Sequence, residues 1–146
     1  MRYSLVWENM ADDSGNLTDG EYTALADFRY ALREFQAFSE GRVAEFGLTP
    51  QQHQALLAIR GATAEGVSIG YVAERLIIKP HSASGLIARL ETAGLVRRRA
   101  SSADRRQILL ELTVDAERLL ERLSVIHRNE ILRLRPLLST LLNSFI

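Results

Sequence analysis

The chain has 146 residues, of which 47% are hydrophobic and 25% charged, a balance typical of a globular protein that buries a core without covalent cross-links. It contains no cysteine, which excludes disulfides, thiolate metal sites and cysteine nucleophiles. No apolar run reaches the length of a membrane span, and the N-terminal segment lacks the long apolar stretch of a signal peptide. We therefore expect a soluble, cytoplasmic protein without a membrane partner.

The N-terminal third predicts an arm followed by a long helix. Residues 1–18 show no clear periodicity, which is typical of a frayed arm. A helix is expected from near Asp19 to about Glu45, because apolar residues recur at spacings of three and four. These residues are Leu25, Phe28, Leu32, Phe35 and Phe38.

Three shorter helices are predicted next from their start and stop signals. Thr49 with Gln52 forms a capping box before a helix that Gly61 ends, with Pro50 at its first position. Ser68 precedes a short helix over Ile69–Arg75. Three residues then lead to a helix over Pro80–Ala93 that Gly94 ends.

After Gly94 the apolar period changes from about 3.6 to about two residues, which predicts a β-hairpin. Its strands are expected over 95–99 and 107–112, with a turn over 101–104. Thr113 caps the next helix, and Pro136 is predicted to break or kink it before a short final helix over 137–146.

The element order predicts a mainly α protein with a small β-hairpin wing, which is a winged helix-turn-helix flanked by long helices. In this motif the second helix, here 80–93, enters the major groove of DNA. The basic residues are concentrated in the segment that holds this motif. Residues 68–113 hold eight basic and four acidic residues, whereas the remainder holds ten basic and fourteen acidic residues. A basic module on a neutral chain would orient the protein on a polyanion.

The helix over 80–93 has one apolar face and one small, polar face. Ala83, Leu86, Ile87 and Leu90 define the face that we expect to be buried. The opposite side carries His81, Gly85 and Ala88, flanked by Ser82, Ser84 and Arg89. A glycine inside a helix costs about 1 kcal/mol relative to alanine, and close approach to a groove wall would explain it. The serines can bind bases or phosphate, and an ordinary solvated surface explains them equally well.

The hairpin is rich in arginine. Five of the ten residues from Arg97 to Arg106 are arginine, with the single acid Asp104. Like charges repel across paired strands, so this pattern favours an anionic partner. Arginine at a narrow tip also suits a narrow minor groove. We expect Asp104 to form an ion pair that shapes the tip.

These segments resemble the MarR (multiple-antibiotic-resistance regulator) family. The resemblance is carried by 48–52, 72–76, 86–96 and, most specifically, by Asp104-Arg105-Arg106 leading to 110–113, and in kind it extends over about 20–146. It implies a homodimer built by the first and last helices, a recognition helix at 80–93, and Arg106 in the minor groove with Asp104 holding the wing. It also implies a small-molecule effector between the dimer helices and the DNA module.

The domain organisation expected is an arm over 1–18, a dimerisation helix over 19–47, a DNA-binding region over 48–113 and dimerisation helices over 114–146. The function expected is a sequence-specific transcriptional regulator, a ligand-responsive repressor that acts as a homodimer on pseudo-palindromic sites in double-stranded DNA. The residues predicted to contact DNA are Lys79, His81, Ser82, Ser84, Arg89, Arg97, Arg99, Arg105 and Arg106.

Other chemistry finds little support in the sequence. The three histidines, His53, His81 and His127, are far apart and show no metal-ligand spacing, and His53 is expected to be structural. No catalytic motif is found, so we predict neither an enzyme nor a cofactor. Tyr30 and Arg33 lie off the phenylalanine stripe and are the candidates for contacts with an effector. The alternative function is a winged helix that binds a protein partner instead of DNA.

Overall fold

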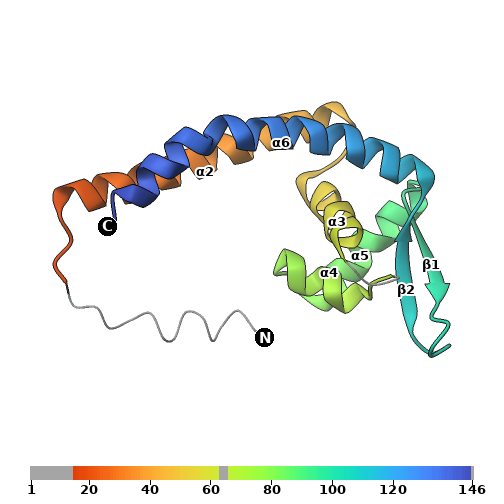
Figure 1. Ribbon diagram of the computed structural model, residues 1–146. Coiled ribbons are helices and arrows are strands. Elements are labelled where there is room, and N and C mark those ends of the chain that lie inside the picture. Colours follow the sequence, from red (N-terminus) through yellow and green to blue (C-terminus); the bar gives the residue numbers. More distant parts are fainter. Residues whose placement is uncertain (1–14, 63–65, 146) are drawn as a thin grey trace. The chain divides into compact units, whose positions relative to one another are not determined.

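The computed structural model describes residues 15–62 and 66–145, and Figure 1 shows their secondary structure. The predicted arm over 1–18 therefore lies mostly outside the described residues, as do 63–65 of the loop after the second helix. The described residues form two compact units, one of 33–134 and the other of 15–32 with 135–145. The elements in chain order are α2 (Asp19–Glu45), α3 (Pro50–Gly61), α4 (Ile69–Leu76), α5 (Pro80–Thr92), β1 (Val96–Ala100), β2 (Ile108–Leu112) and α6 (Val114–Asn143).

The helix starts follow local hydrogen-bond chemistry. The Thr49 hydroxyl accepts from the amide of Gln52, whose side chain accepts from the Thr49 amide in return, which confirms the predicted capping box. Thr18 and Glu21 form the same reciprocal pair at the start of α2. The prediction placed this start correctly but missed the box, although the Thr-x-x-Glu spacing is visible in the sequence. Ser68 caps α4 by accepting from the amide of Tyr71 at 3.1 Å.

The tight connection between α4 and α5 is made by a left-handed residue. Ile77 ends α4 with φ 55° and ψ 49°, and the amide of the next residue, Ile78, donates to the carbonyl of Ala73 at 3.0 Å. This closes the helix end as a Schellman motif does. The expected two-helix motif is thus present, with α4 one residue longer than predicted and α5 ending at Thr92.

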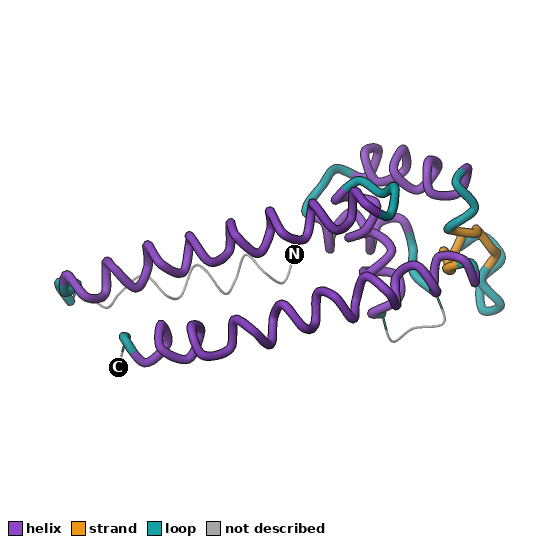
Figure 2. The backbone as a smooth tube through the Cα atoms, turned by 90° about the horizontal axis from the view of Figure 1, so that it is seen from above, coloured by secondary structure: helices purple, strands orange, loops and turns teal. Residues whose placement is uncertain are grey.

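A two-stranded antiparallel hairpin, β1 with β2, follows α5 (Figure 2). Its register pairs Val96 with Leu112 and Ala100 with Ile108, so each strand lies within one residue of its predicted bounds. Val67 forms an isolated bridge to Leu110, with amide–carbonyl distances of 3.4 and 2.8 Å. This bridge attaches the segment before α4 to the hairpin.

Helix α6 corrects the prediction made for Pro136. The helix runs without a break from Val114 to Asn143 with Pro136 inside it, so the separate helix predicted over 137–146 is wrong. Proline removes one backbone donor, but the helical pattern resumes at once, and the Thr140 hydroxyl donates to the Pro136 carbonyl at 3.0 Å. The expected cap by Thr113 is confirmed, since its hydroxyl accepts from the amide of Ala116.

The core of the 33–134 unit fixes the winged helix. Its largest fully buried side chains come from helices and strands alike: Leu56, Leu86, Ile87, Leu90, Leu110, Leu123, Val43, Val72 and Val96. Full burial of each such side chain stabilises the fold by roughly 1.5–3 kcal/mol. The core therefore holds α5 by its apolar face, with α3, α4 and the hairpin packed around it.

Candidate nucleic-acid interface

The two faces of α5 are those that the sequence predicts. Ala83, Leu86, Ile87 and Leu90 are buried in the core, each no more than 1% exposed. His81, Ser82, Ala88 and Arg89 are exposed, and Gly85 is partly exposed. The outer surface of α5 is therefore solvent-accessible and carries small side chains, with Arg89 as its one long basic side chain.

Hydroxyl groups on α5 are partly committed to the helix itself. The Ser84 hydroxyl donates to the carbonyl of Pro80 at 3.2 Å, and that of Thr92 to the carbonyl of Ala88 at 3.0 Å. Such back-bonding leaves a hydroxyl less able to donate to a base. Lys79, at the cap position, makes no capping hydrogen bond with its side chain. The free amides of the first turn of α5 are thus open to an anion such as a phosphate.

Backbone contacts, rather than the expected ion pair, hold the tip of the hairpin. The carboxylate of Asp104 accepts from the amide of Arg106 at 3.0 Å, and its carbonyl accepts from the amide of Gln107 at 3.0 Å. The buried hydroxyl of Ser101 accepts from the amides of Ala103 and Asp104 at 3.2 and 3.4 Å. Asp104 is therefore placed to shape the turn that carries the arginines, by an Asx-type contact.

The arginines of β1 are paired, and this corrects the expected repulsion across the strands. The register sets Arg97 opposite Glu111, and leucines opposite the next two arginines. Glu111 contacts both Arg97, at 3.5 Å, and Arg99, at 2.9 Å. Arg98 pairs with Glu91 of α5 at 3.3 Å. Sequence reasoning missed Glu111, although its place in the returning strand was a signal for a cross-strand partner.

The tip arginines differ from those of the strand. Arg105 and Arg106 are exposed, and neither side chain forms an ion pair or hydrogen bond within residues 15–62 and 66–145. Figure 1 shows the hairpin as a narrow extension of the winged helix. Two uncompensated cations thus stand at its tip, where an anion can reach them.

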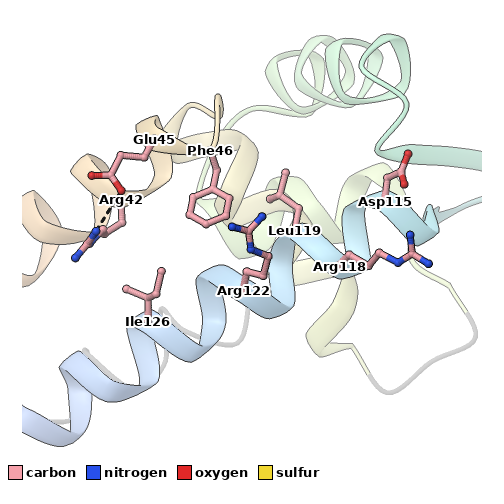
Figure 3. A pocket seen from close by; sticks show the side chains of 8 residues that line it. All are labelled: Arg42, Glu45, Phe46, Asp115, Arg118, Leu119, Arg122 and Ile126. Atoms are coloured by element: carbon pink, nitrogen blue, oxygen red, sulfur yellow. Dashed lines mark hydrogen bonds and ion pairs between the residues drawn. The ribbon is translucent and has the colours of Figure 1, made fainter.

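A pocket of about 700 Å³ opens between α2 and α6 within the 33–134 unit (Figure 3). Its lining combines three arginines, two acids and three apolar side chains: Arg42, Glu45, Phe46, Asp115, Arg118, Leu119, Arg122 and Ile126. The Arg122 guanidinium lies 4.9 Å from the centre of the Phe46 ring, a cation–π distance. Arg42 pairs with Glu45 at 3.2 Å, so the net positive charge comes from the α6 side.

The predicted effector contacts, Tyr30 and Arg33, do not line this pocket. Tyr30 is 61% exposed, and Arg33 is exposed as well. The lining residues lie further along α2 and on the first turns of α6. Only the packing of these two helices identifies them, since no motif in the sequence marks them.

Two histidines that are far apart in the sequence meet in the core. The rings of His53 on α3 and His127 on α6 lie 4.9 Å apart, centre to centre, and Phe35 and Phe38 of α2 meet the His127 ring edge-on. Burial, and then the proximity of His127, lowers the pKa of His53 to about 4. Burial also lowers the pKa of His127.

Within the described residues, the ring nitrogens of His127 form no hydrogen bond. The carbonyls of Leu123 and Ser39 favour its protonated form, but neither ring nitrogen has a partner with hydrogen-bond geometry among the described residues. The described residues hold no group of three or more histidine or acidic side chains suited to a metal ion. The pair is therefore a neutral, apolar contact between α3 and α6, in agreement with a structural His53.

No helix in the described part of the chain is long and apolar enough to cross a membrane.

Comparison with known proteins identifies the fold. A family model described as MarR family matches residues 46–107, and no curated protein matches the chain. The solved structure of AbsC, a MarR family transcriptional regulator from Streptomyces coelicolor, is 24% identical, with a TM-score of 0.66 over 82% of this chain and 81% of AbsC. A MarR family protein from Bacillus stearothermophilus is 17% identical, with a TM-score of 0.70 over 82% of each chain.

A third similar structure is that of MepR from Staphylococcus aureus in complex with DNA. It is 21% identical, with a TM-score of 0.64 over 83% of this chain and 85% of MepR. At these identities the likenesses establish the shared fold, and the family model covers the helix-turn-helix and most of the wing. Residues 46–107 of this chain match the MarR family model, and the described chain has the fold of the MarR family structures.

Proposed function

We propose that this protein is a sequence-specific DNA-binding transcriptional regulator without enzymatic activity. The observation that carries the proposal is the pair of uncompensated cations at the wing tip, Arg105 and Arg106, in a winged helix whose α5 has an exposed face of small side chains. Helix α5 suits the major groove and an arginine at a hairpin tip suits the minor groove. The DNA complex of MepR, which shares the fold, supports this proposal.

The protein acts as a homodimer in this proposal. In the unit of 15–32 with 135–145, Ala24, Ala31 and Leu141 are buried, whereas several bulky apolar residues are exposed. Leu25, Phe28 and Leu32 of α2 are each more than 40% exposed. A stripe of this kind indicates a covering partner, and a second copy supplies one with two-fold symmetry. Sedimentation should give a dimer for the native chain and a monomer for Phe28→Glu.

The pocket between α2 and α6 is the proposed effector site. Its cations and the Phe46 ring favour a small anion with an apolar or aromatic body. A ligand there changes DNA affinity only if it binds one spacing of the two DNA-binding regions better than another. Such a ligand would make the protein a responsive repressor when it favours the spacing that does not fit DNA.

The test is DNA binding across a salt series. Genomic fragments are compared for native protein, for Arg106→Ala, and for Arg128→Ala, which removes an exposed arginine of α6 outside the winged helix. Each phosphate neutralised contributes about −0.9 to the slope of log affinity against log salt. Arg106→Ala should reduce the slope of a dimer by about two, whereas Arg128→Ala should leave it unchanged.

The outcomes separate the two functions. A fragment bound far more tightly than bulk DNA, with a steep slope that depends on Arg106, supports the regulator. The absence of DNA binding at low salt would overturn it. If the chain instead forms a salt-insensitive complex with a protein, the winged helix binds a protein partner and not DNA.

A further inference from the structure

The outer face of α5 carries one guanidinium, that of Arg89, together with the shorter polar side chains of His81 and Ser82. Ala88 and Gly85 have no polar side-chain group, and the hydroxyls of Ser84 and Thr92 donate to helix carbonyls. Arg89 is the one arginine of α5. A guanidinium forms two parallel hydrogen bonds to the O6 and N7 atoms of guanine, which makes it the commonest specific reader in the major groove.

The guanidinium of Arg89 lies against the helix over Gly85. A β-carbon built on Gly85 would lie 3.5 Å from Nη1 of Arg89, which is ordinary van der Waals contact. Long side chains on a helix lean toward its N-terminus, so Arg89 points back across the position four residues earlier. The missing side chain at 85 leaves the surface beside the guanidinium open, and a β-carbon there would still be in ordinary contact with it.

Arg89 is also uncompensated, in contrast to the arginines of the nearby strand. Arg97, Arg98 and Arg99 each pair with a glutamate. Arg89 has no ion pair or hydrogen bond through its side chain within the described ranges. Its five donors are therefore available to a ligand, and they are carried on a helix that the core holds rigidly through Leu86 and Leu90.

We propose that Arg89 determines specificity by reading a guanine in the major groove, and that Gly85 provides the space in which its guanidinium lies. This inference rests on the proposed function and names the residue and the base class through which α5 would select its site.

The experiment selects bound sequences from random duplex DNA and counts them before and after selection. It compares the native chain with Arg89→Ala, Gly85→Ala, Gly85→Val and Lys79→Ala. Gly85→Ala is the matched control for Gly85→Val, because a β-carbon at 85 lies in ordinary contact with Nη1, whereas we expect the added γ-methyl groups of valine to displace the guanidinium. Thermal melting of each variant confirms that it is folded.

The native chain should enrich guanine at one position of each half-site. Arg89→Ala should reduce that preference about tenfold or more and leave the other positions unchanged. Gly85→Val should reduce the same preference, whereas Gly85→Ala should preserve it. Lys79→Ala should weaken binding to all sequences about equally, as loss of a phosphate contact does.

Two results would overturn the inference in distinguishable ways. If the native chain enriches no sequence, the proposed function fails and the inference fails with it. If it enriches a site, but Arg89→Ala weakens all sequences equally, Arg89 contacts phosphate and the regulator stands without this reader. Equal behaviour of Gly85→Val and Gly85→Ala would reject the role given to Gly85.

Discussion

The imidazole rings of His53 and His127 lie 4.9 Å apart and tilted by 31° in the core, joining α3 of the winged helix to α6. They are 6% and 8% exposed. Protonation of either ring would place a charge in an apolar site beside its neighbour. Protonation of either ring is therefore expected to weaken the contact between the two helices.

The first prediction is a loss of stability in weak acid. The pKa of His53 is about 4 in the folded chain against 6.5 for an unperturbed histidine, so between these pH values the unfolded chain binds more protons. The free energy of unfolding is then highest above about pH 6.5 and falls as pH drops toward 4. By pH 4 the loss from His53 is about 3 kcal/mol, and His127 adds in the same direction.

The measurement is urea unfolding of native chain and His53→Gln at several pH values. Carboxylates titrate in both proteins, so the difference between the two isolates the histidine. The native chain should lose more stability than the variant between pH 6.5 and 4. Parallel curves would show that His53 titrates normally in the fold.

The second prediction concerns Ile77, which ends α4 in a left-handed conformation with φ 55°. This conformation is strained for a β-branched residue, and the side chain is 92% exposed, so it contributes little packing. Ile77→Gly should raise the free energy of unfolding by about 1 kcal/mol after the greater freedom of glycine in the unfolded chain is included. Ile77→Ala, which retains a β-carbon, should raise it by less. Chemical denaturation measures both, and a glycine variant no more stable than the alanine variant would contradict the strain.

The third prediction is that Glu111 restrains the charge of the wing. Its carboxylate contacts Arg97 and Arg99, so Glu111→Gln should remove a negative charge that competes with phosphates for these arginines. Non-specific DNA affinity should rise and the salt slope should steepen, while stability should fall by no more than about 1 kcal/mol, because the pairs are partly exposed.

The control is Glu121→Gln, which makes the same charge change on exposed α6. Fluorescence anisotropy with a random duplex in a salt series compares the two variants. If both variants change the slope equally, net charge rather than the wing explains the effect.

The fourth prediction tests the pocket with benzoate, an aromatic carboxylate that matches its cations and its Phe46 ring. Benzoate should raise the melting temperature of the native chain, because a ligand that binds the folded state stabilises it. The rise should be lost in Arg122→Ala and kept in Arg128→Ala. An equal rise in all three proteins would place benzoate elsewhere.

The sequence by itself determined the elements whose signals are local. The capping box of Thr49 and Gln52, the cap at Ser68 and the stop at Gly94 act through hydrogen bonds and backbone dihedrals within a few residues, so their spacing predicts them. The two faces of α5 follow from helical periodicity in the same way. The winged helix could be predicted because consecutive short elements pack on one another.

Tertiary structure decided the contacts between distant residues. Which helix faces pack together decides the contact of His53 with His127 and the position of the pocket at Arg122. Strand register decides the pairing of Glu111 with Arg97 and Arg99. Pro136 shows that a local signal can also mislead. The sequence predicts a break there, but the helix continues, because one missing backbone donor is tolerated when the flanking turns remain helical. Local patterns determine where elements begin and end, whereas side chains that meet across the fold obey packing geometry that no spacing in the sequence encodes.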